Sequence, residues 1–160
     1  MEKQMEPRIV DLPPMRVARA TGFGPEPEFL AWAKLLAWAR RQGIADDFQG
    51  HRFFGFNNPN PTVGSPNYGY EQWITVDSAA QADSDVSIGE CPGGLYAVAR
   101  CQGVQNIYET WNALLIWCEK SGYIIARGQC LEECLSVNLV GLDPAPWAEV
   151  WFDLHLPIAR

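Results

Sequence analysis

Two adjacent glutamates in a thiol-rich segment are the first candidates for chemistry. Glu132 and Glu133 stand between Cys130 and Cys134, in a run that is expected to form a strand. Because successive strand residues point to opposite faces, Glu132 shares a face with both cysteines and Glu133 faces the other way. One carboxylate should therefore lie among apolar or thiol neighbours, where burial raises the pKa of a carboxyl. A cationic ligand would neutralise the charge of that carboxylate. The same pattern also allows both glutamates to reach solvent on an edge strand.

Aromatic residues are frequent and suit the same class of ligand. The chain of 160 residues holds seven Trp, five Tyr and seven Phe. Aromatic faces attract cations by roughly 0.5–2 kcal/mol per contact and stack on planar molecules. Core packing is the competing explanation for each of these rings. The residues predicted to line a ligand pocket are Glu132, Trp73, Tyr70, Trp111, Tyr68, Trp32, Phe54 and Tyr96.

Composition restricts the possible partners. The formal net charge is −7 and no basic stripe is visible, so direct nucleic-acid binding is not expected. No apolar run approaches the roughly 18 residues of a membrane helix, and the first residues lack the apolar stretch of a signal peptide. We therefore expect a protein without membrane contact, located in the cytoplasm.

Cysteine, histidine and nucleophile patterns do not indicate a familiar catalytic or metal centre. An odd count of five cysteines argues against a disulfide framework, and with two histidines they match no zinc pattern. His155 and Asp153 are expected to share a strand face, where a structural role is the simpler interpretation. We expect no cofactor and no metal. Glu132 with Tyr70 or Tyr96 as base and donor leaves a hydrolase as an alternative, but the sequence favours a binding protein over an enzyme.

Two amphipathic helices and several strands would position these residues. Apolar residues at three- and four-residue spacing predict helices over about 28–42 and about 107–121, and Gly43 and Gly122 are placed to end them with positive φ. A strand is expected before each helix, at 16–20 and 95–99. Further strands are expected at 8–12, 52–56, 70–76, 85–90, 130–137 and 149–156, with a linker over 77–85.

The chain also matches itself when shifted by 79 positions. The pattern W-x-x-L-L-x-W-x-x-x-x-G occurs at 32–43 and again at 111–122, and Pro13, Ala18, Ala20 and Gly24 fall on identical residues. This predicts a single domain over 1–160 made of two βαββ-type repeats, about 8–77 and about 85–160, related by a pseudo-two-fold axis. The predicted class is α+β, with an antiparallel sheet and two long helices.

Several segments resemble the GyrI-like domains, in the same order along the chain. They are Gly-Glu-Cys-Pro-Gly-Gly-Leu-Tyr-Ala-Val at 89–98, the Trp and Leu residues at 110–117, Cys-Leu-Glu-Glu-Cys-Leu at 130–135, Phe-Asp-Leu-His-Leu-Pro-Ile at 152–158, and shorter matches at 54–59 and 70–73. The resemblance implies tandem βαββ units. It also implies a small-molecule site like that of the effector-binding domains of BmrR- and Rob-type multidrug regulators. Standalone members occur on mobile gene cassettes, and this chain resembles such a standalone form.

The resemblance assigns the pocket acid to Glu132. It implies binding of cationic, amphipathic, partly aromatic molecules, the multidrug type of ligand. Cys134 stands where the family has a tyrosine, so the wall there would be smaller. Family members also suggest two alternatives, a hydrolase of reactive electrophiles and a protein-binding modulator such as a gyrase inhibitor. A separate regulator and a second copy of the chain stay open as protein partners.

Overall fold

The computed structural model describes residues 6–44 and 48–160. The chain divides into two compact units. Unit 1 combines the N-terminal stretch up to Pro13 with Gly93–Arg160, and unit 2 is the continuous segment Pro14–Pro92. Each consists of antiparallel strands and one long helix, so the predicted α+β class with antiparallel strands and two long helices is confirmed.

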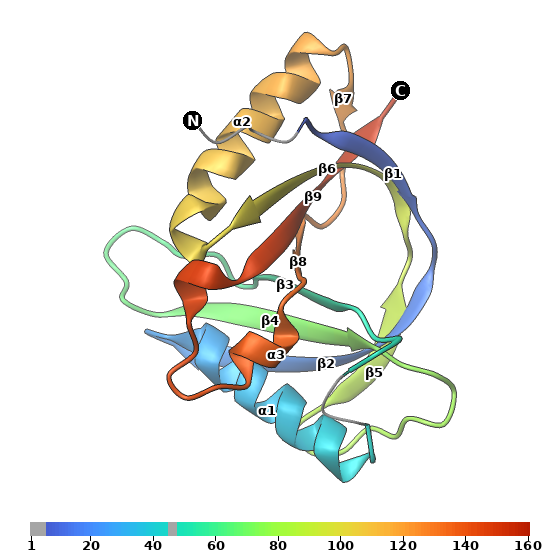
Figure 1. The fold of residues 1–160 in the computed structure, drawn as a ribbon, viewed down its shortest axis with the longest axis vertical. Helices are drawn as coiled ribbons and strands as arrows, with labels where there is room; N and C mark the ends of the chain where they lie inside the picture. The colour runs from blue at the N-terminus through green and yellow to red at the C-terminus, as the bar shows by residue number, and fades with distance from the viewer. Residues whose placement is uncertain (1–5, 45–47) are drawn as a thin grey trace. The chain divides into compact units, whose positions relative to one another are not determined.

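Unit 2 is a four-stranded antiparallel sheet carrying one helix. Its strands are β2 (Met15–Gly24), β3 (Phe53–Asn57), β4 (Tyr68–Thr75) and β5 (Ser87–Cys91), in the order β3-β4-β2-β5. Helix α1 (Pro27–Arg41) packs on β2 and β4 (Figure 1). It begins with a proline and an acidic residue and ends with two arginines, the order that suits the helix dipole.

A glycine allows the close approach of helix to sheet in unit 2. A side chain at Gly22 would collide with the backbone of Pro27 and lie 2.8 Å from Leu30 Cβ. Ala18 and Ala20 share this face and are also buried. Small residues at alternate positions of β2 therefore define the sheet face that carries α1.

Unit 1 has a similar plan. Strands β1 (Arg8–Leu12), β6 (Gly94–Gln102), β9 (Trp151–Ala159) and β8 (Leu131–Cys134) form an antiparallel sheet in that order, and β7 (Ile124–Ile125) pairs with the end of β9. Helix α2 (Ile107–Lys120) packs on β6 and β9 (Figure 1). Its buried residues Leu114 and Cys118 form one core cluster with Ala97 and Ala99 of β6 and Leu156 of β9. Short helical turns lie at Val104–Asn106, Val137–Val140 (α3) and Trp147–Glu149.

Both long helices agree with the sequence prediction to within one residue at each end, and the strand at 8–12 agrees in full. Gly43 and Gly122 have φ values of 75° and 79°, as the helix ends require. The strand predicted at 130–137 was too long. It stops at Cys134. The Leu135 N–H still bonds to Trp151 O, but the Trp151 N–H is accepted by the side chain Ser136 Oγ instead of a backbone oxygen, and the chain then turns into α3.

The predicted linker is held against unit 2. Trp38 Nε1 donates to Gln81 O over 2.9 Å, and Arg41 pairs with Asp83 at 2.8 Å. Trp38 is fully buried, on the same helix face as Ala31 and Leu35. The segment between β4 and β5 is therefore attached to α1 by a hydrogen bond and an ion pair. Over the described part of the chain, no helix is long and apolar enough to cross a membrane.

Candidate functional site

Glu132 and Trp111 come together in unit 1. Glu132 is opposite Leu154 in the β8–β9 pairing, which directs its side chain to the face that carries α2. Trp111, in the second turn of α2, donates its indole N–H to Glu132 Oε2 over 3.4 Å. Both side chains are partly exposed, so solvent reaches a carboxylate that is held beside an aromatic ring.

Two thiols share the electrostatic environment of Glu132. Burial raises the pKa of Cys101 and of Cys130, and the negative charge of Glu132 raises both further. These cysteines therefore stay protonated at neutral pH and act as polarizable, neutral neighbours of the carboxylate. All five cysteines are free, and burial raises the pKa of Cys134 to about 12.

Glu133 lies on the opposite face of β8. It is 6% exposed, and its Oε1 is 3.7 Å from Nε2 of the fully buried His155. Its charge also helps to raise the pKa of Arg100, behind the larger effect of the Asp153 hydrogen bond. His155 directs Nδ1 at the backbone oxygen of Asp153, 3.1 Å away. Glu133 and His155 are therefore both buried, on the face of the unit 1 sheet that does not carry α2.

The same face holds a compensated carboxylate. Asp153 accepts hydrogen bonds from Arg8 Nη2 at 2.6 Å and from Arg100 Nε at 2.8 Å. Burial opposes its ionisation, but the hydrogen bonds and charges of the two arginines outweigh burial and lower the pKa of Asp153. This ion cluster links β1, β6 and β9.

Tyr96 is separated from Glu132 by strand alternation. It lies on the face of β6 away from α2, where its ring meets the His155 ring edge-on at 5.8 Å between centroids. Within unit 1, the structure therefore brings Glu132 together with Trp111 and does not bring Tyr96 to the same face.

Three candidate aromatic residues lie on the α1 face of unit 2. Trp32 stacks on Phe53 with 5.6 Å between ring centroids, and the Tyr68 hydroxyl donates to Glu28 Oε1 over 2.6 Å. The Tyr70 ring lies over Gly55, and a side chain at position 55 would collide with the Tyr70 hydroxyl. Trp32 and Tyr70 are buried and Tyr68 is half-buried.

Trp73 and Phe54 point to the other face of unit 2. The guanidinium of Arg19 lies 5.1 Å above the Trp73 ring, and that of Arg52 lies 5.0 Å above the Phe54 ring. Trp73 Nε1 donates to Glu71 Oε1 over 2.9 Å. Each of these rings therefore already has a cation from the protein on one side.

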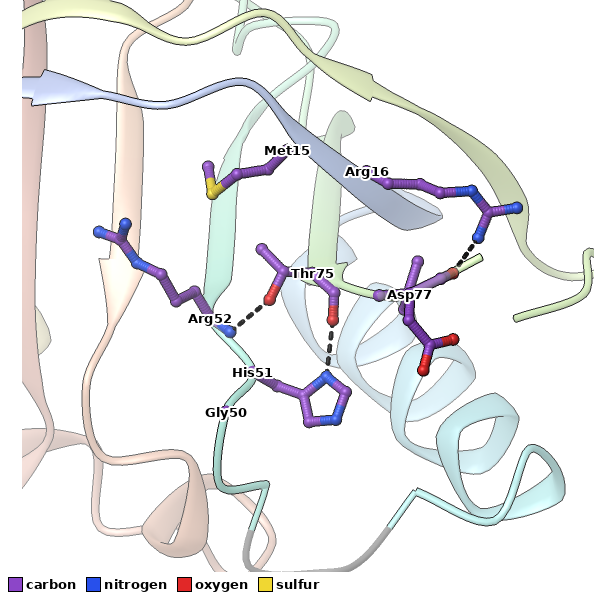
Figure 2. Close-up of a pocket in the computed structure, with 8 residues that line it drawn as sticks. Met15, Arg16, Gly50, His51, Arg52, Thr75 and Asp77 are labelled. Atoms are coloured by element: carbon purple, nitrogen blue, oxygen red, sulfur yellow. Dashed lines mark hydrogen bonds between the residues drawn. The ribbon is translucent and has the colours of Figure 1, made fainter. Parts of the chain in front are cut away.

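A hollow in unit 2 contains none of the predicted residues. It has a volume of about 480 Å³ and lies where β2 begins, β3 begins and β4 ends (Figure 2). Its lining consists of Met15, Arg16, Gly50, His51, Arg52, Thr75, Val76 and Asp77. In the sequence, three of these residues form the run Gly-His-Arg at 50–52, which is not part of any motif described above.

Known structures show the same fold over almost the whole chain. A hydrolase from Listeria innocua superposes with a TM-score of 0.72 at 13% identity, covering 99% of this chain and 94% of that one. The EcmrR C-terminal domain superposes with a TM-score of 0.69 at 14% identity, covering 97% and 98%. SAV2435 bound to tetraphenylphosphonium superposes with a TM-score of 0.53 at 11% identity, covering 97% and 94%.

A family model agrees with these superpositions and with the sequence resemblance. The model describes the GyrI-like small molecule binding domain and matches residues 5–152, which leaves out residues 1–4 and most of β9. Two observations lead to one assignment. They are the antiparallel units with two long helices and the match of the family model over nearly the full length of the chain. The chain belongs to the GyrI-like family of small-molecule binding domains.

Proposed function

We propose that this GyrI-like domain binds cationic, partly aromatic small molecules at Glu132 and Trp111. The observation that carries the proposal is the half-exposed carboxylate of Glu132, placed 3.4 Å from the Trp111 indole and beside neutral thiols. A cation at this position would gain the carboxylate charge and an aromatic face together. The rings of Trp73 and Phe54 each already contact an arginine of the protein, so Trp111 is the aromatic residue assigned to the cation.

The chemistry of one structural relative supports this ligand class. SAV2435, which shares the fold, is bound to tetraphenylphosphonium, a cation surrounded by four phenyl rings. We extend the proposal to three further points: a multidrug type of ligand, a cytoplasmic location and a separate regulator as partner.

The predicted internal duplication is also part of the proposal, and the strand register supports it. Met15 of β2 pairs with Cys91 of β5, and Gly94 of β6 pairs with Leu12 of β1. Both β2 with β6 and β1 with β5 are thus offset by 79 positions, the same offset that aligns the two tryptophan-containing helices.

The test compares two ions of almost the same shape and opposite charge, tetraphenylphosphonium and tetraphenylborate. Calorimetry should give micromolar affinity for the cation, about −8 kcal/mol, and much weaker binding of the anion. Glu132→Gln should weaken cation binding at least about tenfold, because the carboxylate charge is lost. Glu119→Gln, which removes an equal charge from an exposed site on α2, should leave it unchanged.

Equal affinity for the two ions would contradict the proposal. So would a Glu132→Gln protein that keeps its melting temperature and still binds the cation as tightly as the original protein.

A further inference from the structure

We infer that the hollow in unit 2 is a second ligand site, selective for small organic anions. Its volume of about 480 Å³ falls within the range of small-molecule pockets. All eight lining residues come from unit 2, at adjacent ends of β2, β3 and β4 (Figure 2). Most of these residues are half-exposed, so a molecule can enter from solvent.

The charge of the hollow is opposite to that of the protein. Two arginines, Arg16 and Arg52, line it with one acidic residue, Asp77, whereas the whole chain has a net charge of −7; the Arg52 guanidinium also lies over the Phe54 ring. Arg16 donates to the backbone oxygens of Asp77 and of Ala80, the latter at 3.4 Å. Carbonyl oxygens orient a guanidinium without neutralising it, so Arg16 retains its full positive charge at the rim.

One neutral donor, the Thr75 hydroxyl, adds to the site. His51 Nδ1 lies 2.6 Å from Thr75 O, and because a carbonyl only accepts, Nδ1 carries the proton and gives it to that oxygen (Figure 2). Thr75 Oγ1 accepts the Arg52 N–H over 2.7 Å, which leaves the hydroxyl proton to donate elsewhere. Met15 and Val76 add apolar surface. The arrangement suits a carboxylate or phosphate monoester that carries an apolar group.

Asp77 supplies a negative charge that opposes anion binding, so its removal should change the affinity in the opposite direction from the loss of Arg16. Its Oδ1 accepts the Ala79 N–H over 2.9 Å, a bond that the amide oxygen of asparagine can also accept. Asp77→Asn should thus preserve the local turn while removing the negative charge from the lining. An anion should then bind more tightly, an effect that partial unfolding cannot mimic.

The experiment titrates the full chain with phenyl phosphate and benzoate, with uncharged benzamide as comparison, and follows backbone amides by NMR at constant ionic strength. Phenyl phosphate should shift the amides at 50–52 and 75–77. Arg16→Gln should weaken its binding at least about tenfold and Asp77→Asn should strengthen it several-fold. Arg127→Gln, an exposed charge in unit 1, is the matched control.

Three results would overturn the inference. They are benzamide binding as tightly as phenyl phosphate, shifts spread over the surface, and an equal loss of affinity in Arg16→Gln and Arg127→Gln. This site is independent of the proposed cation site. Glu132→Gln should therefore leave phenyl phosphate binding unchanged, and Arg16→Gln should leave tetraphenylphosphonium binding unchanged.

Discussion

Neighbouring residues of β8 have opposite environments, and this determines what each can do. Glu133 is buried beside His155, whereas Glu132 is partly exposed beside Trp111. A charge that the interior has already accommodated gains little from a ligand, whereas a carboxylate at the solvent boundary can exchange water for a cation. Strand alternation alone therefore separates a structural acid from a candidate binding acid.

The Trp111 indole is expected to act through both its ring and its N–H. Trp111→Phe keeps an aromatic face but removes the donor to Glu132, so the carboxylate loses its positioning contact. We expect tetraphenylphosphonium affinity to fall by about three- to tenfold, less than in Glu132→Gln, and Trp111→Ala to cost more. Calorimetry on the three variants checks the order. An affinity in Trp111→Phe equal to that of the original protein would show that the N–H has no part in binding.

Asp153 should make the stability of the protein depend on acid pH. The pKa of Asp153 is lower in the folded protein than in the unfolded chain. Its contribution to the stability of the protein is therefore complete above the unfolded pKa of about 3.9 and is lost as pH falls through the folded pKa. Asp153→Asn should lower the free energy of unfolding by about 1–3 kcal/mol at pH 7 and reduce the loss of stability between about pH 4 and pH 2. Urea titrations at several pH values measure both effects. Asp11→Asn, an exposed carboxylate on β1, should change neither.

At the scale of elements, the contact between β3 and β4 depends on a missing side chain. The Tyr70 ring covers Gly55, and a Cβ there would also lie 2.6 Å from Gln72 Oε1. Gly55→Ala should therefore destabilise the protein by about 1–3 kcal/mol through overpacking. Gly141→Ala is the control, because φ at Gly141 is not positive and its nearest neighbour would be 3.8 Å away. Thermal denaturation compares the two, and equal melting temperatures would contradict the packing argument.

The helices were the most predictable elements, and the environments of single residues were the least. Apolar spacing and the glycines at 43 and 122 determine where α1 and α2 lie, because those signals are local in sequence. The side chain of Tyr96 was grouped with Glu132, yet the two point to opposite sheet faces, which only the pairing of β6, β9 and β8 reveals. The hollow could not be predicted either, because it forms where three strand ends meet.

At the scale of the whole molecule, the sequence order of the strands differs from their grouping into units. β1 comes first in the chain but pairs with β6 of unit 1, while unit 2 takes β5 as its own edge strand. Deleting the chain up to Leu12 should therefore expose one edge of β6 and leave the strands of unit 2 paired.

Native-state hydrogen exchange tests this deletion. Amides of β6 that face β1 should lose protection, while amides of β2 and β4 keep theirs, because local opening follows the loss of local pairing. A uniform loss of protection in both units would show that stability is shared over the whole chain.

The position of β1 also has a consequence for synthesis on the ribosome. β1 emerges before any other described strand, but its partner β6 begins only at Gly94, after the whole of unit 2 has been made. At about 5–20 residues per second, this strand waits several seconds with its backbone groups unpaired. Its short length and its two charged residues, Arg8 and Asp11, are features that keep such an unpaired segment from aggregating with other nascent chains.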